Sequence, residues 1–229
     1  MREQKDKEWG EIVDKFDFNT ITNFDDHIKK SIPNYEILLE TILSISDYFI
    51  SNDSHVYDLG CSTGKLLKLL DPSKDIIKHG FDNSKLMPKI DEGAWGRINF
   101  KEVDLNGDFS LINASLVYSI FTLQFLKRER RGAFCDHVYK GLNKGGAFIL
   151  CEKIYQEGGM MQEVMAFSHY DYKCKHFSEE EIIKKERDLR LIMKPNTLKQ
   201  NMELLKESGF EAITPFWQSF NFIGLIAIK

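Results

Sequence analysis

The sequence has few cysteines and no long apolar segment. Its four cysteines are spread over positions 61, 135, 151 and 174, and no two form a C-x-x-C pair. We therefore expect reduced thiols, without disulfides, a zinc site or another bound metal. No apolar run approaches the roughly 18 residues of a membrane span. The start, "MREQKDKEWGEIVDKFDF", is charged where a signal peptide is apolar. These absences favour a cytoplasmic protein with no membrane association.

An excess of positive charge is also missing. The formal net charge is −4 and 29% of the residues are charged. This balance argues against a broad basic face for nucleic acid, so we expect no direct nucleic-acid binding. The local run "KRERR" (127–131) is the exception. It is typical of a solvated helix start, and contact with an RNA phosphate backbone is the alternative.

Linker-like composition is absent as well. The chain of 229 residues has five prolines, no Gly/Ser-rich stretch and no internal repeat. We therefore predict one domain spanning residues 1–229. The three- and four-residue apolar spacing in "YEILLETILSISDYF" predicts an amphipathic helix within an N-terminal helical cap, 1–50. The charge-rich stretch 159–209 predicts a helical insertion.

Between these parts, apolar strand patterns alternate with helical ones. The sequence predicts strands at 55–59, 76–81, 97–103, 114–120 and 146–152, and helices at 63–70, 84–91 and 127–142. Such alternation is typical of an α/β fold with a doubly wound, mostly parallel sheet. The closing "FWQSFNFIGLIAIK" adds one or two strands, which we interpret as a C-terminal antiparallel hairpin.

A glycine turn follows the first predicted strand, in "HVYDLGCSTGKLLKLL" (55–70). A phosphate-binding P-loop needs four residues between its glycines and Ser or Thr after its lysine. Here three residues separate Gly60 from Gly64, and Leu66 follows Lys65. The dinucleotide fingerprint fails too, because its third glycine is missing. The turn therefore belongs to a ligand that is not held through phosphates.

Carboxylates stand at the ends of the first three strands. Asp58 lies two residues before Gly60, Asp82 ends the second strand, and Asp104 follows the third. A carboxylate at Asp58 would repel a pyrophosphate and suit an ammonium group, whereas Asp82 can accept hydrogen bonds from two ribose hydroxyls. Each alone would more often be a turn or cap residue. Together they point to the crevice at the carboxyl ends of a parallel sheet.

The pattern Asp58-x-Gly60-x-Ser62-x-Gly64 resembles the first motif of class I S-adenosylmethionine (SAM)-dependent methyltransferases, whose Rossmann-like fold fits the predicted sheet. A narrower resemblance, to the carboxy-S-adenosylmethionine synthase family, covers most of the chain. It rests on "FDDHIKKSIPNYEILLE" (24–40), "VYDLGCSTG" (56–64), "FDNSKLM" (81–87), "FTLQFL" (121–126), "YKGLNKGGAFILCEK" (139–153) and "FWQSFNFIGLIAIK" (216–229).

The resemblance implies an enzyme that converts SAM and prephenate into carboxy-SAM, which a partner enzyme uses to modify a tRNA wobble uridine. It implies a homodimer, SAM or carboxy-SAM as the bound cofactor, and a catalytic contribution from Tyr35. The matching cofactor-binding positions are Tyr35, Asp58, Gly60, Cys61, Ser62, Gly64, Asp82, Asn83, Asp104 and Leu105.

Two positions depart from the family. Ile120 stands where the family has asparagine and cannot replace the amide hydrogen bonds. Glu186 stands where the family has an arginine that pairs with the new carboxylate, and Arg187 follows it. Arg187 is either a catalytic substitute for that arginine or part of a solvated helix, since one helical residue rotates a side chain by about 100°.

We place Ile120, Glu186 and Arg187 in the substrate pocket, together with His169 and Tyr170 of the insertion. His169 and Tyr170 can serve as a general base or substrate anchor, or can be ordinary partly buried aromatic residues. Two further functions remain open. One is a SAM-dependent methyltransferase, or another SAM-consuming enzyme, acting on an unknown small-molecule acceptor. The other is a non-catalytic SAM-binding protein.

Overall fold

The computed structural model describes residues 23–71, 73–88 and 98–229. The part of the predicted N-terminal cap that precedes residue 23 lies outside these ranges. The helices of the described residues are α1 (Phe24–Ser31), α2 (Tyr35–Ser46), α3 (Lys65–Leu69), α4 (Arg131–Gly141), α5 (Gly159–Lys173), α6 (Glu179–Ile192) and α7 (Leu198–Glu207), with short 3-10 helices η2 (Leu123–Phe125) and η3 (Arg128–Arg130).

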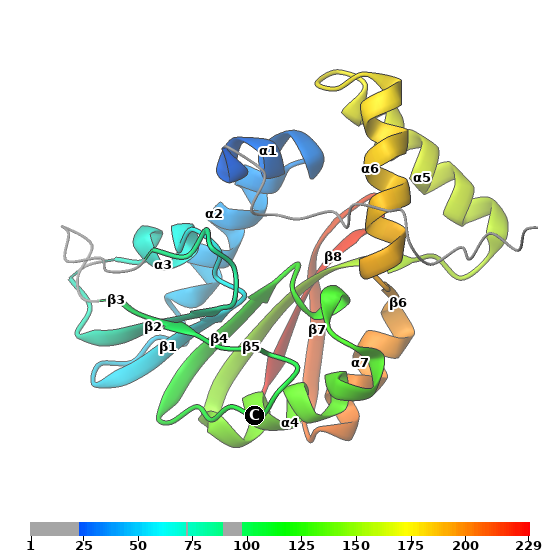
Figure 1. Cartoon of the computed structure of the whole chain (residues 1–229). Coiled ribbons are helices and arrows are strands. Elements are labelled where there is room, and N and C mark those ends of the chain that lie inside the picture. Colours follow the sequence, from blue (N-terminus) through cyan, green and yellow to red (C-terminus); the bar gives the residue numbers. More distant parts are fainter. Residues whose placement is uncertain (1–22, 72, 89–97) are drawn as a thin grey trace, which may run out of the picture.

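Eight strands form the sheet around which these helices pack (Figure 1). They are β1 (Ser54–Leu59), β2 (Ile76–Asp82), β3 (Ile98–Glu102), β4 (Ala114–Ile120), β5 (Leu142–Tyr155), β6 (Asn196–Thr197), β7 (Ala212–Ser219) and β8 (Phe222–Ile228). The order is β3-β2-β1-β4-β5-β8-β7, with β6 beside β5. Strands β1 to β5 are parallel, and β8 runs antiparallel to β5 and β7. The predicted fold class is confirmed.

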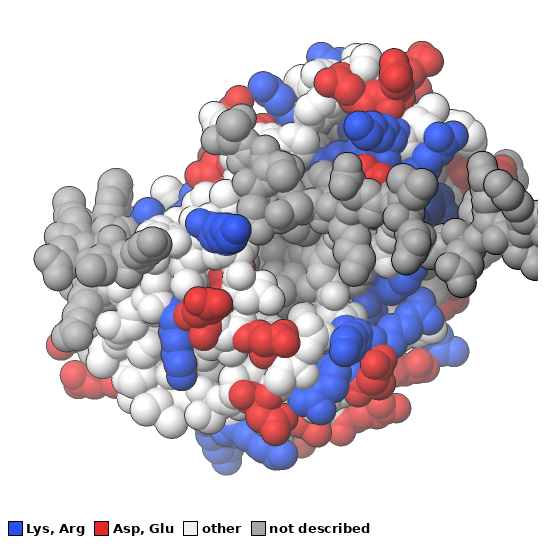
Figure 2. All heavy atoms as spheres, in the orientation of Figure 1, with Lys and Arg blue, Asp and Glu red and all other residues white. Residues whose placement is uncertain are grey.

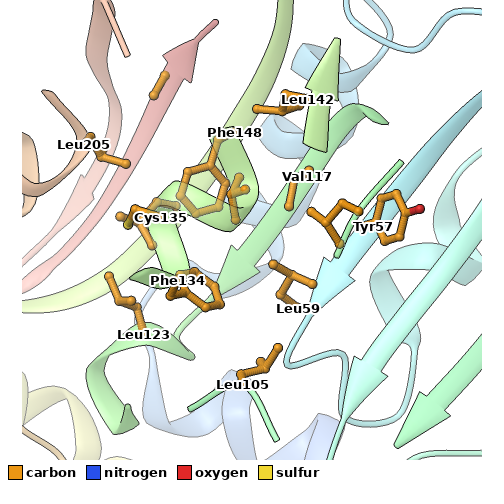
Figure 3. Packing of buried hydrophobic residues seen from close by; sticks show 14 of the residues in the cluster. Tyr57, Leu59, Leu105, Val117, Leu123, Phe134, Cys135, Leu142, Phe148 and Leu205 are labelled. Atoms are coloured by element: carbon orange, nitrogen blue, oxygen red, sulfur yellow. The ribbon is translucent and has the colours of Figure 1, made fainter. Parts of the chain in front are cut away.

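Apolar side chains extend from both faces of the sheet and form one hydrophobic core on each face. On one face Leu59, Val117 and Phe148 meet Phe134 of α4 and Leu205 of α7 (Figure 3). On the other face, Leu38 and Ile42 of α2 and Leu67 of α3 pack against the sheet. The strands have near-continuous apolar runs, so both faces of the sheet must be covered by helices.

Three helices lie outside the helix layers that cover the two faces of the sheet. In Figure 1, α1, α5 and α6 rise above the edge of the sheet, whereas α4 and α7 lie along its opposite side. Helix α7 packs against α4, and its Leu205 belongs to the core. The helical stretch predicted at 159–209 thus divides in two. Helices α5 and α6 project from the sheet, and α7 is one of the helices that cover it.

Most predicted element boundaries agree with the structure, with three differences. Strand β7 begins at Ala212, before the predicted closing segment 216–229. Residues 84–87 form a turn and not the start of the predicted helix 84–91, whose last residues lie outside the described ranges. Strand β5 spans Leu142–Tyr155 and is much longer than the predicted 146–152. Its extra length reflects additional pairing, since its last two residues join β6 and Lys153 joins β8. Among the described helices, none is long and apolar enough to cross a membrane.

Candidate functional site

A cavity of about 350 Å³ opens at the carboxyl ends of the parallel strands. The glycine turn and the strand-end residues Asp58, Asp82 and Ile120 line its floor. Side chains of α1, α2, α5 and α6 line the rest, including Tyr35 and His169. Helices from the N-terminal part of the chain and from the stretch 159–192 therefore close over the crevice in which doubly wound sheets bind ligands.

Three residues of the glycine turn have positive φ, namely Gly60, Ser62 and Gly64. Gly60 has φ +90°, and a Cβ atom there would lie 2.0 Å from Thr122 Oγ1. Gly64 has φ +72° and precedes α3, and a Cβ atom there would lie 2.5 Å from the Phe100 ring. Both positions require glycine for conformation and for space. Gly60 lines the cavity, whereas Gly64 shapes the turn from behind it.

Asp82 ties this turn to the next strand. Its Oδ2 atom accepts a hydrogen bond of 2.7 Å from the Ser62 backbone N–H, and its Oδ1 atom accepts one of 2.7 Å from the Ser84 N–H. Each carboxylate oxygen can accept a second hydrogen bond. Asp82 can therefore fix the loop and bind hydroxyl groups of a ligand at the same time.

Asp58 and Tyr35 both line the cavity, and the charge of Asp58 acts on the Tyr35 hydroxyl. Burial, with a smaller contribution from the charge of Asp82, raises the pKa of Asp58 to about 7. Burial and the nearby Asp58 raise the pKa of Tyr35 well above its ordinary value. The Tyr35 hydroxyl therefore remains a neutral hydrogen-bond donor at neutral pH, which disfavours it as a proton acceptor. A cationic ligand group beside Asp58 would favour the ionised carboxylate.

The remaining predicted cofactor positions also surround the cavity. Cys61, Ser62, Asn83, Asp104 and Leu105 all line it. Asp104 is exposed and its Oδ1 atom accepts hydrogen bonds from the Asn106 backbone and side-chain nitrogens, at 2.9 and 3.1 Å. The buried hydroxyls of Ser62 and Ser84 have no hydrogen-bond partner within the described part of the protein. Such orphaned groups suit a polar ligand.

The opposite side of the cavity is basic. Lys153, Lys173 and Lys185 line it, from β5, α5 and α6 respectively. Glu186 accepts a hydrogen bond of 2.7 Å from Lys173 Nζ at Oε1, and its Oε2 atom lies 3.5 Å from Lys153 Nζ. Burial would raise the pKa of Glu186, but the two lysines outweigh it and lower the pKa to about 2. Glu186 is thus a fixed negative charge between two buried lysines.

The predicted substrate residues do not all meet in the cavity. Ile120, His169 and Glu186 line it, whereas Tyr170 lines a smaller adjoining cavity of about 40 Å³. Arg187 is exposed and lines neither cavity. The structure therefore does not place Arg187 where the family's arginine would act, because the helix directs Glu186 inward and Arg187 outward.

His169 has a structural contact that the sequence does not reveal. The side chain is buried, and its Nε2 atom lies 2.8 Å from the Ser31 carbonyl oxygen of α1. Burial and the charge of Lys173 lower its pKa to about 4, so the ring is neutral and Nε2–H donates to the carbonyl. Tyr172 adds a second hydrogen bond, of 3.0 Å, to the Lys29 carbonyl oxygen. These two bonds fasten α5 to α1 above the cavity.

Several lining residues escape sequence reasoning. Thr122, Gln124, Lys153, Lys173, Lys185 and Phe222 all line the cavity. Lys153 ends the apolar run and the matched segment 139–153, and Thr122, Gln124 and Phe222 also lie in segments that carry the family resemblance. Lys185 lies beside Arg187 in the helix for which a solvated face is one of the two interpretations, and Lys173 lies in the charge-rich insertion 159–209. In Figure 2, Lys, Arg, Asp and Glu side chains are interspersed over the face that it draws.

The residues present fit SAM better than a metal or a phosphate ligand. The described residues include no group of three or more His, Cys, Asp or Glu side chains that could hold a metal ion. Asp58 suits an ammonium group, Asp82 suits ribose hydroxyls, and Leu105 and Phe121 give the cavity apolar surface.

No family model matches the chain. Individual relatives, however, agree with a SAM site. The chain is 38% identical over 217 residues to "Carboxy-S-adenosyl-L-methionine synthase" of Staphylococcus epidermidis, covering 92% of this chain and 94% of that protein. It is 36% identical over 224 residues to the protein of the same name in Shewanella oneidensis, covering 94% and 92%.

Solved structures show the same fold at low identity. A putative methyltransferase of Haloferax volcanii in complex with the Trm112 activator has a TM-score of 0.59 and 13% identity, covering 85% of this chain and 91% of that one. Human N-acetylserotonin methyltransferase in complex with SAM has a TM-score of 0.52 and 17% identity. That match covers 76% of this chain and 47% of the human chain.

Proposed function

Because the chain belongs to the carboxy-S-adenosyl-L-methionine synthase family, we propose that it converts SAM and prephenate into carboxy-SAM. The observation that carries the proposal is a single cavity with two chemically distinct sides. One side offers the glycine turn and strand-end carboxylates that suit SAM, and the other offers lysines that suit an anionic co-substrate. We further propose that residues 1–229 act as one SAM-binding domain.

We propose a binding role for each of the residues that line the acidic side of the cavity. Asp58 would face the ammonium group of SAM and Asp82 the ribose hydroxyls, while Asp104 and Leu105 would hold the adenine. Tyr35 would donate a hydrogen bond from its neutral hydroxyl. When bound, SAM supplies a methyl carbon activated by the adjacent sulfonium. The protein's own contribution is to hold that carbon between the two sides of the cavity and to exclude water with α1, α5 and α6.

A second function has one observation in its favour. Glu186 neutralises part of the basic side, and Ile120 presents an apolar side chain at the end of β4. A site changed in this way would accept a less anionic substrate, so a SAM-dependent methyltransferase acting on a small molecule is the second candidate. Structural neighbours do not separate the two, since both kinds of enzyme share the fold.

Mass spectrometry tests the proposal directly. The purified protein is denatured and the released ligand identified, and the folded protein is then incubated with SAM and prephenate. Formation of carboxy-SAM is the expected result. SAM that stays unchanged after prephenate is added would reject the synthase activity. A Glu186→Arg variant that produces more carboxy-SAM than the natural chain would show that this departure limits the reaction.

We also propose that the carboxy-SAM supports tRNA wobble-uridine modification in the cytoplasm through a partner enzyme, without direct RNA binding by this chain. Reduced thiols support this compartment. Among the described residues Cys61, Cys135 and Cys151 are buried and unbridged, and Cys174 is exposed. A mobility-shift assay with tRNA is expected to show no complex.

A homodimer completes the proposal, with the outer face of α5 as its interface. Met160, Val164 and Phe167 follow one another at helical spacing, and Met160 and Phe167 are 79% and 64% exposed. Exposed apolar stripes of this kind mark association surfaces. Sedimentation is expected to show a dimer that Phe167→Glu dissociates. A monomer at all concentrations would reject this part of the proposal.

A further inference from the structure

The loop that follows β3 presents Asp104 to the cavity with only one of its two carboxylate oxygens engaged. Asp104 Oδ1 accepts hydrogen bonds from the backbone N–H and the side-chain amide of Asn106, at 2.9 and 3.1 Å. These bonds lower the pKa of Asp104 below its ordinary value, so the carboxylate is ionised at neutral pH. Its Oδ2 atom accepts no hydrogen bond from the residues that the structure describes. One charged acceptor therefore remains for a ligand in the cavity.

Asn106 holds this arrangement with all four of its polar groups. Both of its nitrogen atoms donate to Asp104, as described. Its side-chain oxygen accepts a hydrogen bond of 2.9 Å from the Lys127 backbone N–H, and its carbonyl oxygen accepts one of 2.5 Å from Arg130 Nε. An amide whose oxygen is fixed by one donor must direct its NH2 group the other way. The bond from Lys127 thus directs the Asn106 amide nitrogen toward Asp104.

The basic run 127–131 therefore serves this loop. Arg130, which belongs to η3, donates to the loop through its Nε atom. It also donates to Asp108 at 2.9 Å, but that carboxylate is 86% exposed, and surface ion pairs of this kind contribute little. Arg131 is buried and donates to backbone carbonyl oxygens of the preceding segment. Two of the three arginines in the run thus bind the chain's own backbone, whereas Arg128 is exposed.

A fixed, charged acceptor at this place distinguishes between purine bases. The exocyclic amino group of adenine donates hydrogen bonds, whereas the 6-oxo group of hypoxanthine has only lone pairs and would face the charge of Asp104. A site built to bind an N–H group rejects an analogue without it, because the acceptor is then left unpaired. This rejection requires the carboxylate to be held, since a side chain that rotates away avoids the repulsion.

We propose that Asn106 and Arg130 are positioning residues, which fix Asp104 and thereby make the cavity selective for a 6-aminopurine nucleoside. The inference rests on the proposed function for the identity of the ligand, because SAM carries adenine. Asn106 occupies Oδ1 of Asp104 and so leaves Oδ2 as the atom that meets the base. Arg130 holds the loop against η3 through the Asn106 carbonyl oxygen.

Calorimetry with S-adenosylhomocysteine and S-inosylhomocysteine tests this selectivity, since the two ligands differ in whether the purine 6-position carries an amino or an oxo group. We expect the natural chain to bind the adenosyl ligand about 30-fold more tightly or better. Asn106→Ala and Arg130→Gln should each reduce this ratio about fivefold or more. Arg128→Gln removes the same charge from the same basic run at an exposed position, so it is the matched control and should leave the ratio unchanged.

Asp104→Asn shows whether Asn106 acts through Asp104. Asn106 would still hold the side-chain oxygen in place of Oδ1, so the new amide nitrogen would replace Oδ2 and donate to an oxo group. This variant should therefore prefer the inosyl ligand, by about threefold. Adding Asn106→Ala should abolish that reversed preference, because the amide is then free to turn over.

The two ligands also separate positioning from general stability. A merely structural role of Asn106 would weaken both ligands equally and leave the ratio of the natural chain in Asn106→Ala, which would overturn the inference. An Asp104→Asn variant that keeps the natural preference for the adenosyl ligand would overturn it as well. Thermal melting checks that each variant folds, and a ratio measured on one sample does not depend on the folded fraction.

The same titrations distinguish this inference from the proposed function. A natural chain that binds both ligands equally refutes only the inference. One that discriminates between them but forms no carboxy-SAM refutes only the synthase activity. A chain that binds neither ligand refutes the proposed function and the inference with it.

Discussion

Gly60→Ala provides a quantitative test of the site, because its two costs can be separated. At φ +90° an alanine backbone is strained by about 1–2 kcal/mol. The added Cβ atom would also lie 2.0 Å from Thr122 Oγ1 and 2.5 Å from Thr122 Cγ2. Overpacking of this kind costs about 1–3 kcal/mol. We therefore expect a total loss of about 2–5 kcal/mol in the free energy of unfolding.

Gly145→Ala isolates the conformational part of this cost. Gly145 has φ +79°, close to that of Gly60, but a Cβ atom there would meet no heavy atom within 4 Å. It should therefore lose only about 1–2 kcal/mol. Thr122→Ala in the Gly60→Ala background removes the two nearest atoms and leaves Thr122 Cβ, at 2.7 Å, so it should recover part of the difference.

Urea denaturation measures these free energies, and calorimetry on the same samples measures SAM affinity. Each kcal/mol corresponds to about 2–4 °C in melting temperature for a chain of this length. Gly60→Ala should also weaken SAM binding, because Thr122 or the turn must move. If Gly60→Ala and Gly145→Ala differ by less than about 0.5 kcal/mol, the close packing of Thr122 on the turn is refuted.

Three further predictions concern buried or strand-end carboxylates. The pKa of Asp58 is raised from 3.8 to about 7, so the stability that its protonated form provides is lost as the pH rises through 7. SAM affinity should rise over the same range, because the carboxylate ionises. Calorimetry between pH 5.5 and 8 measures this affinity, and an affinity that does not change with pH would contradict the prediction. Asp82→Ala should lower SAM affinity about 100-fold, because it removes two hydrogen bonds to backbone N–H groups of the loop. Asp108→Ala is the control, since this carboxylate is exposed, and it should leave SAM affinity unchanged. Burial raises the pKa of Glu152 to about 8, so this carboxyl group is mostly neutral at pH 7. Glu152→Ala should cost about 3 kcal/mol in urea denaturation, because it leaves a cavity, and the neutral isostere Glu152→Gln should cost much less. Equal losses would contradict the neutral state.

Local sequence patterns account for the acidic side of the cavity. Apolar runs and strand-end carboxylates belong to single strands, and parallel strands bring their carboxyl ends to one edge. Asp58, Asp82 and Asp104 could therefore be assigned to one site from the sequence alone. The turn at 84–87 could not, because its helical pattern competes with the Asp82 hydrogen bond that begins the turn.

The sequence by itself determined the parallel α/β fold, the glycine turn and the acidic side of the cavity, because each strand carries its own apolar pattern and end residue and parallel pairing brings those ends to one edge. Only the tertiary structure decided the basic side. Lys153, Lys173 and Lys185 lie on three different elements, and only packing of α5 and α6 above the sheet brings them to one cavity. Helical spacing shows that Glu186 and Arg187 must point in different directions, but which of them faces the ligand depends on how α6 is rotated against its neighbours.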